Sequence, residues 1–224
     1  MKIGVFDSGK GGTTVLAEIK KALPGAEYRY IGDSANCPYG DKTDEELMRI
    51  VCGHVETLRE WGAEIIVIAC NTATTRCIKR LREMYPEIKF VGTEPAVKLA
   101  AESGATRILV MATAGTVAAE RTKKLAQDNQ RVGQEIVLLA CPGLADAIEK
   151  DKNVDEILDM VLDGSESGDR DARYGTPDVV VLGCTHYSLI RNKIQKRFPN
   201  AKIIDGNEGV KNRVLGIIKE YNIK

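Results

Sequence analysis

Two cysteines stand at matching places in the chain, each just after an apolar run. Cys70 follows Ile65–Ala69 in "ACNTAT", and Cys184 follows Val179–Leu182 in "LGCTHYS". A thiol acts as a base only as thiolate, a form that a helix N-terminus or a nearby cation favours. Taken singly, either cysteine is most simply a buried, inert thiol. Their repeated placement instead indicates two acid–base groups that serve one site.

Polar residues that could hold a small substrate follow both thiols. Asn71, Thr72 and Thr185 carry amide and hydroxyl groups suited to a carboxylate or an ammonium group. His186 is one of only two histidines and can transfer protons near neutral pH. These residue types indicate proton transfer at a small polar molecule.

The stretch "DSGKGGTT" at residues 7–14 follows the first predicted strand. Its glycines could present backbone N–H groups to an anion such as a carboxylate, with Asp7 at the strand tip. It has neither the register of a P-loop nor the pattern GxGxxG, so we expect no nucleotide site. A tight turn in which Ser8 or Thr13 caps the next helix is an equally supported alternative.

A second loop, "GDSANCPYG" at residues 32–40, is rich in turn residues such as Asp33 and Pro38. Tyr39 could line a pocket with its ring or simply pack. Cys37 is a rival reactive thiol, but it lies within the loop rather than at a strand tip.

The remaining cysteines are expected to be structural. Cys77 lies on the helix after Cys70 and is predicted to join the core, while Cys52 is expected to pack and His54 to lie on a helix surface. Cys141 ends a predicted strand, and its role is open. The chain has no CxxC pair and only two histidines, so we expect no metal site.

Short β-branched runs alternate with helical patterns throughout the chain. The predicted strands are Lys2–Phe6, Glu27–Ile31, Glu64–Ala69, Lys89–Val91, Arg107–Ala112, Glu135–Ala140, Asp178–Leu182 and Lys202–Ile204. The predicted helices are Thr13–Ala22, Thr43–Trp61, Thr72–Tyr85, Pro95–Ser103, Thr116–Asp128, Pro142–Lys150, Val154–Leu162, Ser188–Arg197 and Asn207–Tyr221. Strands that are apolar on both faces and joined by helices indicate an α/β fold with mostly parallel sheets.

The two halves of the sequence resemble each other. Each opens with a strand, then small and hydroxyl residues, then a helix, in "KIGVFDSGKGGTT" and "RILVMATAGTV". We expect two similar lobes, residues 1–93 plus 205–224 and residues 94–204, each a mostly parallel sheet flanked by helices. Ligands of open α/β sheets bind at the carboxyl ends of the strands, so the two cysteines would face each other across a cleft between the lobes.

The charge balance narrows the classes of partner. Basic and acidic residues number 32 each, which argues against a large surface for nucleic acid or anionic lipid. No segment approaches the length of a membrane span, and the apolar run at the N-terminus is too short for a signal peptide. A cytoplasmic protein with reduced thiols is therefore expected. Residues 163–175 are predicted to form a mobile surface loop, and a homodimer is one option for the assembly, which the sequence does not fix.

The motifs "FDSGKGG", "PYG", "ACNTAT" and "GCTHY", in this order and spacing, resemble the glutamate racemases of the aspartate/glutamate racemase family over nearly the whole chain. The resemblance implies two α/β lobes with the active site between them. It also implies racemisation of an acidic amino acid without pyridoxal phosphate or metal. Supply of D-glutamate for bacterial peptidoglycan would be the biological role.

The resemblance further implies roles for residues at matching positions. Cys70 and Cys184 would be the catalytic acid–base pair, assisted by Asp7 and His186 respectively. Glu149 would lie near the substrate ammonium group. The complete set of implied substrate-binding residues is Ser8, Tyr39, Gly40, Asn71, Thr72, Thr113, Thr116, Glu149 and Thr185.

Inversion of an α-carbon explains why two thiols would be needed. One group must take the proton from one face, and another must return a proton to the opposite face. We expect one cysteine to be a thiolate and the other a thiol, with the roles exchanged for the opposite enantiomer. No lysine lies in a recognisable Schiff-base motif, so no pyridoxal phosphate is expected, and the resemblance implies no other cofactor.

The sequence departs from the family pattern at Lys10, Thr13, Gly143–Asp146 and Ser188, and the chain is shorter than typical members. These departures concern the substrate rather than the chemistry. A racemase for aspartate or another amino acid is thus the nearest alternative. A thiol redox protein with a disulfide between the two cysteines, and an amino-acid-binding protein without catalysis, are alternatives from other classes.

Overall fold

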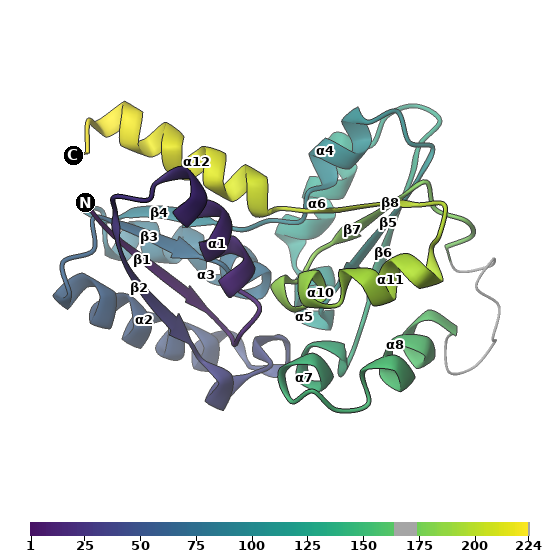
Figure 1. The fold of residues 1–224 in the computed structure, drawn as a ribbon, viewed down its shortest axis with the longest axis horizontal. Helices are drawn as coiled ribbons and strands as arrows, with labels where there is room; N and C mark the ends of the chain where they lie inside the picture. Colours follow the sequence, from purple (N-terminus) through teal and green to yellow (C-terminus); the bar gives the residue numbers. More distant parts are fainter. Residues whose placement is uncertain (164–173, 224) are drawn as a thin grey trace.

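The computed structural model describes residues 1–163 and 174–223. The predicted surface loop at 163–175 therefore lies outside the described residues, apart from its ends. The described chain forms two lobes side by side, and the N-terminus and the last helix belong to the same lobe (Figure 1). None of the helices in these two ranges is both long and apolar enough to cross a bilayer.

The first lobe is built on a parallel sheet in the order β2-β1-β3-β4. Its strands are β1 (Lys2–Asp7), β2 (Glu27–Gly32), β3 (Ile65–Ile68) and β4 (Lys89–Gly92). Its helices are α1 (Thr13–Ala22), α2 (Asp44–Glu60), α3 (Asn71–Met84) and α12 (Asn207–Tyr221), with short 3₁₀ turns η1 (Ser34–Asn36) and η2 (Tyr39–Asp41).

The second lobe repeats this arrangement in the order β6-β5-β7-β8. Its strands are β5 (Arg107–Ala112), β6 (Glu135–Ala140), β7 (Val179–Leu182) and β8 (Lys202–Asp205). Its helices are α4 (Val97–Glu102), α5 (Ala114–Ala118), α6 (Glu120–Asn129), α7 (Leu144–Glu149), α8 (Val154–Asp163), α10 (Thr185–Leu189) and α11 (Arg191–Arg197). The predicted two-lobed α/β fold with parallel sheets is confirmed.

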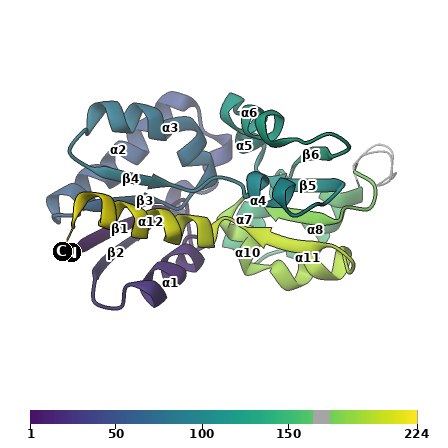
Figure 2. The ribbon, with the colours of Figure 1, turned by 90° about the horizontal axis from the view of Figure 1, so that it is seen from above.

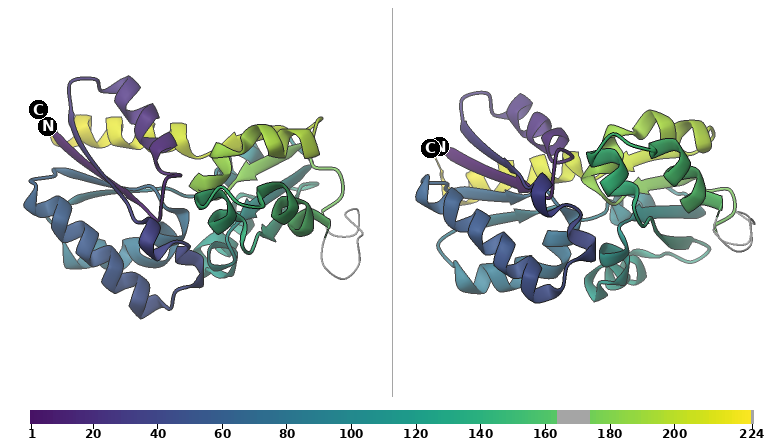
Figure 3. Two further views of the ribbon diagram at one scale, coloured as in Figure 1. Left: turned by 60° about the horizontal axis from the view of Figure 1, so that its bottom comes forward. Right: turned by 90° about the horizontal axis from the view of Figure 1, so that it is seen from below.

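Successive side chains of the central strands point to opposite faces of each sheet, and helices cover both faces. In β1, Ile3 and Val5 pack with α1 and α12, whereas Phe6 packs with α2 and α3. In β5, Leu109 packs with α7, α8, α10 and α11, whereas Ile108 packs with α4. Figures 2 and 3 show these layers from other sides. Burial on both faces explains why the strands are continuous apolar runs.

Two predicted helices differ from the structure. The segment predicted at Thr116–Asp128 is divided at Ala119, and the segment predicted at Ser188–Arg197 begins at Thr185 and is divided at Ile190. The Thr113 side chain accepts a hydrogen bond from the backbone N–H of Thr116 and so caps the start of α5, and the break comes at Ala119, whose ψ of 129° is that of extended backbone. Both additional short helices begin at the carboxyl ends of strands, next to predicted site residues.

The chain crosses between the lobes after β4 and again after β8. The two crossings touch, because a Cβ atom added at Gly206 would lie 2.8 Å from the carbonyl oxygen of Glu94. After the second crossing, α12 packs Val210 and Val214 against the same core cluster as α1. This return supports our division of the chain into 1–93 plus 205–224 and 94–204, which we keep as a proposal.

Candidate active site

The two thiols lie at corresponding ends of the two sheets. Cys70 follows β3 and is the N-cap residue of α3, and Cys184 follows β7 and is the N-cap residue of α10. β3 and β7 occupy the same position in their sheets, next to β1 and β5. Both side chains are buried, with exposed fractions of 5% and 8%. The strand-end placement that the sequence indicated is therefore present in both lobes.

At both thiols, burial raises the pKa by more than the helix N-terminus lowers it. Burial, and then the negative charge of Asp7, raises the pKa of Cys70 from 9.0 to about 11, although backbone N–H groups of α3 and the Ser8 hydroxyl act in the opposite direction. Burial, and then the proximity of Cys70, raises the pKa of Cys184 well above its ordinary value. The two sulfur atoms are thus close enough to interact, and both are thiols at neutral pH. The N-terminal N–H groups of α3 and α10 lower the two pKa values, as expected, but burial has the larger effect.

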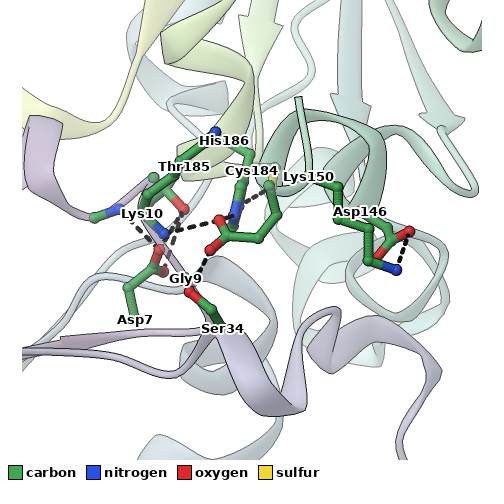
Figure 4. A network of polar contacts seen from close by, with 12 residues as sticks. Asp7, Gly9, Lys10, Ser34, Asp146, Lys150, Cys184, Thr185 and His186 are labelled. Carbon is green, nitrogen blue, oxygen red and sulfur yellow. Dashed lines mark hydrogen bonds and ion pairs between the residues drawn. The ribbon is translucent and has the colours of Figure 1, made fainter. Parts of the chain in front are cut away.

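His186 joins Cys184 to a carboxylate (Figure 4). Its Nδ1 lies 3.8 Å from the sulfur of Cys184, and its Nε2 lies 2.8 Å from a carboxylate oxygen of Glu149. The histidine is fully buried. A carboxylate at the far nitrogen fixes the orientation of the ring and, by accepting from Nε2–H, leaves Nδ1 as the acceptor that faces Cys184. Cys184 therefore has a proton acceptor in contact with it.

Glu149 connects the second lobe to the first. Its carboxylate accepts hydrogen bonds from the backbone N–H of Lys10, at 2.9 Å, and from the hydroxyl of Ser34. Burial alone would raise its pKa, but the hydrogen bonds from Ser34, Lys10 and His186 prevail and lower it. Glu149 is therefore an anion in this structure. Its role beside a substrate ammonium group stays a prediction, and Ser34 is absent from the residues inferred from the sequence.

Asp7 makes a second polar connection between the lobes. Its carboxylate accepts from the backbone N–H of Gly12 at 2.8 Å and from the hydroxyl of Thr185 at 3.2 Å. Complete burial raises the pKa of Asp7, and the nearby His186 and the hydrogen bonds only partly offset this. The glycine-rich turn thus uses one of its N–H groups on its own aspartate.

Three threonine hydroxyls from the two lobes meet in the interior. The hydroxyl oxygen of Thr72 lies 2.9 Å from that of Thr113 and 3.0 Å from that of Thr116, and the last two are 3.0 Å apart. All three residues are buried. Each hydroxyl can rotate its hydrogen outward to donate. The group can therefore present several donors to one carboxylate.

Asn71 carries an unused acceptor. Within residues 1–163 and 174–223 its buried Oδ1 atom has no hydrogen-bond partner. Such an atom costs about 1–3 kcal/mol when it is left unpaired in a protein interior. A ligand with an ammonium group would remove that cost.

Tyr39 is placed differently from the other predicted binding residues. Its ring is buried in the core of the first lobe, and its hydroxyl donates to Asp33 at 2.7 Å. His54 reaches the same carboxylate at 2.9 Å and packs its ring against Phe6. The prediction that His54 lies on a helix surface is wrong, because only one face of α2 is exposed and this ring points inward. Neither Asp33 nor His54 was inferred as functional from the sequence.

Gly40 lies at one of the close approaches between the lobes. A Cβ atom at Gly115 would lie 2.8 Å from the carbonyl oxygen of Gly40, and a Cβ atom at Gly40 would lie 3.2 Å from Thr113. The backbones of η2 and α5 thus touch beside the three threonine hydroxyls. The sequence alone could not reveal this contact.

The other thiols are mostly structural. Cys77 is 2% exposed in the core of the first lobe, and Cys52 packs against that core, as expected. Cys141 is buried in the core of the second lobe. Cys37, by contrast, is half-buried beside the site, where burial and the charge of Glu149 raise its pKa to about 12.

The departures from the family pattern lie around the site rather than in it. The ammonium group of Lys10 forms an exposed ion pair with Asp151 at 2.7 Å, and Thr13 is exposed. Gly143 has a φ of 74°, a conformation that glycine adopts without strain, and it begins α7. The hydroxyl of Ser188 donates to Asp205 at 3.4 Å.

A family model described as Asp/Glu/Hydantoin racemase matches residues 3–210. Among curated proteins, a glutamate racemase from Halothermothrix orenii is 40% identical over 228 residues, which cover 100% of this chain and 87% of that relative. A glutamate racemase from Sulfurovum sp. is 37% identical and covers 98% of this chain and 83% of its own length.

Solved structures agree with these relatives. A glutamate racemase from Escherichia coli, in complex with L-glutamate and the activator UDP-MurNAc-ala, superposes with a TM-score of 0.83 at 30% identity and covers 97% of this chain and 82% of that one. A glutamate racemase isoform from Bacillus anthracis has a TM-score of 0.80 at 30% identity, with 99% and 82% covered. An aspartate racemase from Picrophilus torridus, at 16% identity and a TM-score of 0.59, shares the fold.

Proposed function

Because the chain belongs to the Asp/Glu/hydantoin racemase family, we propose that it interconverts L- and D-glutamate without a cofactor, with Cys70 and Cys184 as the two proton-transfer groups. The observation that carries the proposal is the pairing of these buried thiols. They come from equivalent positions of the two sheets, and they are close enough for one to influence the pKa of the other.

The substrate would be held by groups from both lobes. The hydroxyls of Thr72, Thr113 and Thr116 suit the side-chain carboxylate, because they form a cluster of neutral donors. The unpaired Oδ1 of Asn71 suits the ammonium group. A substrate held at both ends would present its α-carbon to the thiols in a fixed orientation, which is the main requirement for efficient proton transfer.

One thiol must lose its proton before the α-carbon can lose its own. For Cys184, the acceptor would be Nδ1 of His186, whose ring Glu149 holds in place through Nε2. For Cys70, the acceptor would be Asp7, a carboxylate whose pKa burial raises toward the range needed of a base. The substrate ammonium group would add a positive charge that favours a thiolate in this buried site.

In one direction, the thiolate of Cys184 would take the α-proton while the thiol of Cys70 delivers its own proton to the opposite face. The substrate then loses one proton and gains one, and its α-carbon is inverted. Cys184 is then a thiol and Cys70 a thiolate. His186 would release to solvent the proton that it had taken from Cys184, and Cys70 would regain a proton from solvent through Asp7, which restores two neutral thiols. In the other direction the two cysteines exchange roles.

The decisive experiment measures racemisation and exchange together. Cys70→Ala and Cys184→Ala are each expected to lower kcat by at least about 10³-fold, since a positioned acid–base group contributes about 10²–10⁴-fold. Chiral chromatography of glutamate and α-proton exchange in heavy water provide the two readouts. Cys52→Ala, which changes a half-buried thiol in α2, is the control. A double variant of Cys70 and Cys184 that racemises at the wild-type rate would refute the mechanism.

The substrate is tested by comparing kcat/KM for glutamate and aspartate. Glutamate is favoured because the four glutamate racemases named above are 30–40% identical to this chain, whereas the aspartate racemase is 16% identical. We also propose that the enzyme works in the cytoplasm and supplies D-glutamate for peptidoglycan. Growth of a bacterial strain that requires D-glutamate, after expression of this chain, would test that role.

A further inference from the structure

Three side chains from distant parts of the sequence converge beside the thiols. Cys37 comes from the loop after η1, Glu149 from the end of α7 and His186 from α10. The sulfur, a carboxylate oxygen and a ring nitrogen all lie within 4.8 Å of one another. We propose that these residues bind Zn²⁺ and that the bound ion inhibits the enzyme by joining the two lobes.

The donor set determines which ion fits. One sulfur, one imidazole nitrogen and one carboxylate oxygen are the ligands typical of Zn²⁺, with water in the fourth position. Mg²⁺ and Ca²⁺ prefer oxygen ligands only, so neither should compete. Binding would release the proton of the Cys37 thiol to the solvent, since the thiolate is the ligand.

The distances require only small movements. Zinc–ligand bonds of about 2.0–2.3 Å place the donors of a tetrahedral site about 3.3–3.7 Å apart. The ring nitrogen of His186 and the carboxylate of Glu149 are 2.8 Å apart and would have to separate slightly, while Cys37 would approach. Side-chain rotation can supply shifts of this size.

Neighbouring groups already hold two of the ligands in place. The backbone N–H of Lys10 and the hydroxyl of Ser34 orient the Glu149 carboxylate, and the sulfur of Cys184 lies at the other nitrogen of His186. Such outer contacts orient the ligands of protein metal sites. Cys37 is half-buried, so solvent can bring the ion to the site.

Inhibition follows from what the ion would occupy. Zinc on His186 and Glu149 would remove the proton acceptor of Cys184, and a ligand from the first lobe would keep the lobes from separating. The inhibition therefore rests on the function proposed above, whereas the binding does not.

Direct binding is measured by calorimetry with ZnCl₂ and by the thiolate-to-metal absorption band of Co²⁺ added to the metal-free protein. The wild-type chain is expected to bind one Zn²⁺ and to show the cobalt band. Cys37→Ser is expected to weaken Zn²⁺ binding at least about 100-fold and to abolish the band, because one of three ligands is lost. Cys52→Ser, a change at another half-buried thiol, should behave as wild type.

Racemase assays complete the test. Wild-type and Cys52→Ser enzymes should lose activity in Zn²⁺ and regain it with a chelator, Mg²⁺ should have no effect, and Cys37→Ser should resist Zn²⁺. Equal Zn²⁺ binding by Cys37→Ser and wild type, or no binding by wild type, would overturn the proposal. Binding that depends on Cys37 in a chain without racemase activity would support the site and count against the proposed function alone.

Discussion

At Cys70 and Cys184 the protein maintains two buried, neutral thiols, one of which influences the pKa of the other. Burial is the main reason that both pKa values are raised, and the negative charge of Asp7 raises both further. A thiolate therefore has to be produced together with a compensating positive charge. If the ammonium group of the substrate supplies that charge, a thiolate forms only when substrate is bound. The thiols would then be protected from oxidation and metal capture between turnovers, since the thiolate is the reactive form.

The raised thiol pKa values predict that the fold weakens in alkali. A thiol with a pKa of about 11 in the folded state and 9.0 when exposed stabilises the fold fully below pH 9.0, and this contribution is lost as the pH rises toward 11. For Cys70 the free energy of unfolding should fall by about 1.4 kcal/mol per pH unit over that range. Urea unfolding at several pH values should give a shallower pH dependence for Cys70→Ser. Identical profiles for the two proteins would contradict the prediction.

Asn71 should affect substrate binding and stability in opposite directions. Asn71→Leu removes a buried acceptor that has no partner in the described part of the chain, so the free energy of unfolding should rise by about 1 kcal/mol. The KM for glutamate should rise at least about tenfold, because the ammonium group loses its acceptor. Steady-state kinetics and urea unfolding check the two effects.

Thr122→Val is the matched control for Asn71. Thr122 lies in α6 and also carries a buried hydroxyl oxygen without a partner in the described residues. Its replacement should raise stability similarly and leave KM unchanged. If Asn71→Leu also leaves KM unchanged, Asn71 does not bind the substrate.

Residue type and position in the sequence predict some of this site but not all of it. Cys70, Cys184 and His186 could be inferred because they follow apolar strands, whose carboxyl ends gather ligands in α/β folds. The roles of Ser34, Asp33 and His54 could not be inferred, because they depend on contacts between segments that lie far apart in the sequence. The same holds for Cys37, which meets Glu149 and His186 only after both lobes have formed.

At the level of elements, α2 illustrates how local sequence sets a boundary. Thr43 and Glu46 form a reciprocal capping box, in which each side chain accepts a hydrogen bond from the backbone N–H of the other. Thr43→Ala should therefore lower the free energy of unfolding by about 1 kcal/mol, measured by urea unfolding. Thr57→Ala, at an exposed position in the last turn of the same helix, should have little effect. Equal losses for both variants would argue against the capping box.

The strands and long helices were predictable because their apolar periodicity reflects burial on one or both faces. Thr13–Ala22 and Asn207–Tyr221 have the predicted bounds, and β5 and β6 do as well. The short helices α5 and α10 were not predictable. Each is five residues long, and its start depends on a strand end and on contacts across the lobes rather than on a periodic pattern.

At the level of the whole molecule, Gly11 sets how closely the lobes approach. A Cβ atom there would lie 2.5 Å from the backbone nitrogen of His186 and 2.7 Å from the carbonyl carbon of Thr185. Gly11→Ala should therefore keep the lobes apart while both cores stay intact. We expect kcat/KM to fall at least about 100-fold, since displacements near 1 Å have effects of that size.

The lobe separation can be measured apart from activity. Small-angle X-ray scattering should give a larger radius of gyration for Gly11→Ala than for wild type. Gly53→Ala, where a Cβ atom meets nothing within 4 Å in the middle of α2, should be as compact and active as wild type. A compact, fully active Gly11→Ala enzyme would show that the lobes tolerate the added atom.

The two thiols have unlike neighbours, a serine hydroxyl at Cys70 and an imidazole at Cys184. Mirror-image forms of free glutamate have the same energy in an achiral solvent, so the equilibrium constant between them is unity. The specificity constants for the two enantiomers must then be equal, however different the two sides of the site are. If the difference between the two sides of the site gives one enantiomer a larger kcat, the KM for that enantiomer must be larger in the same proportion.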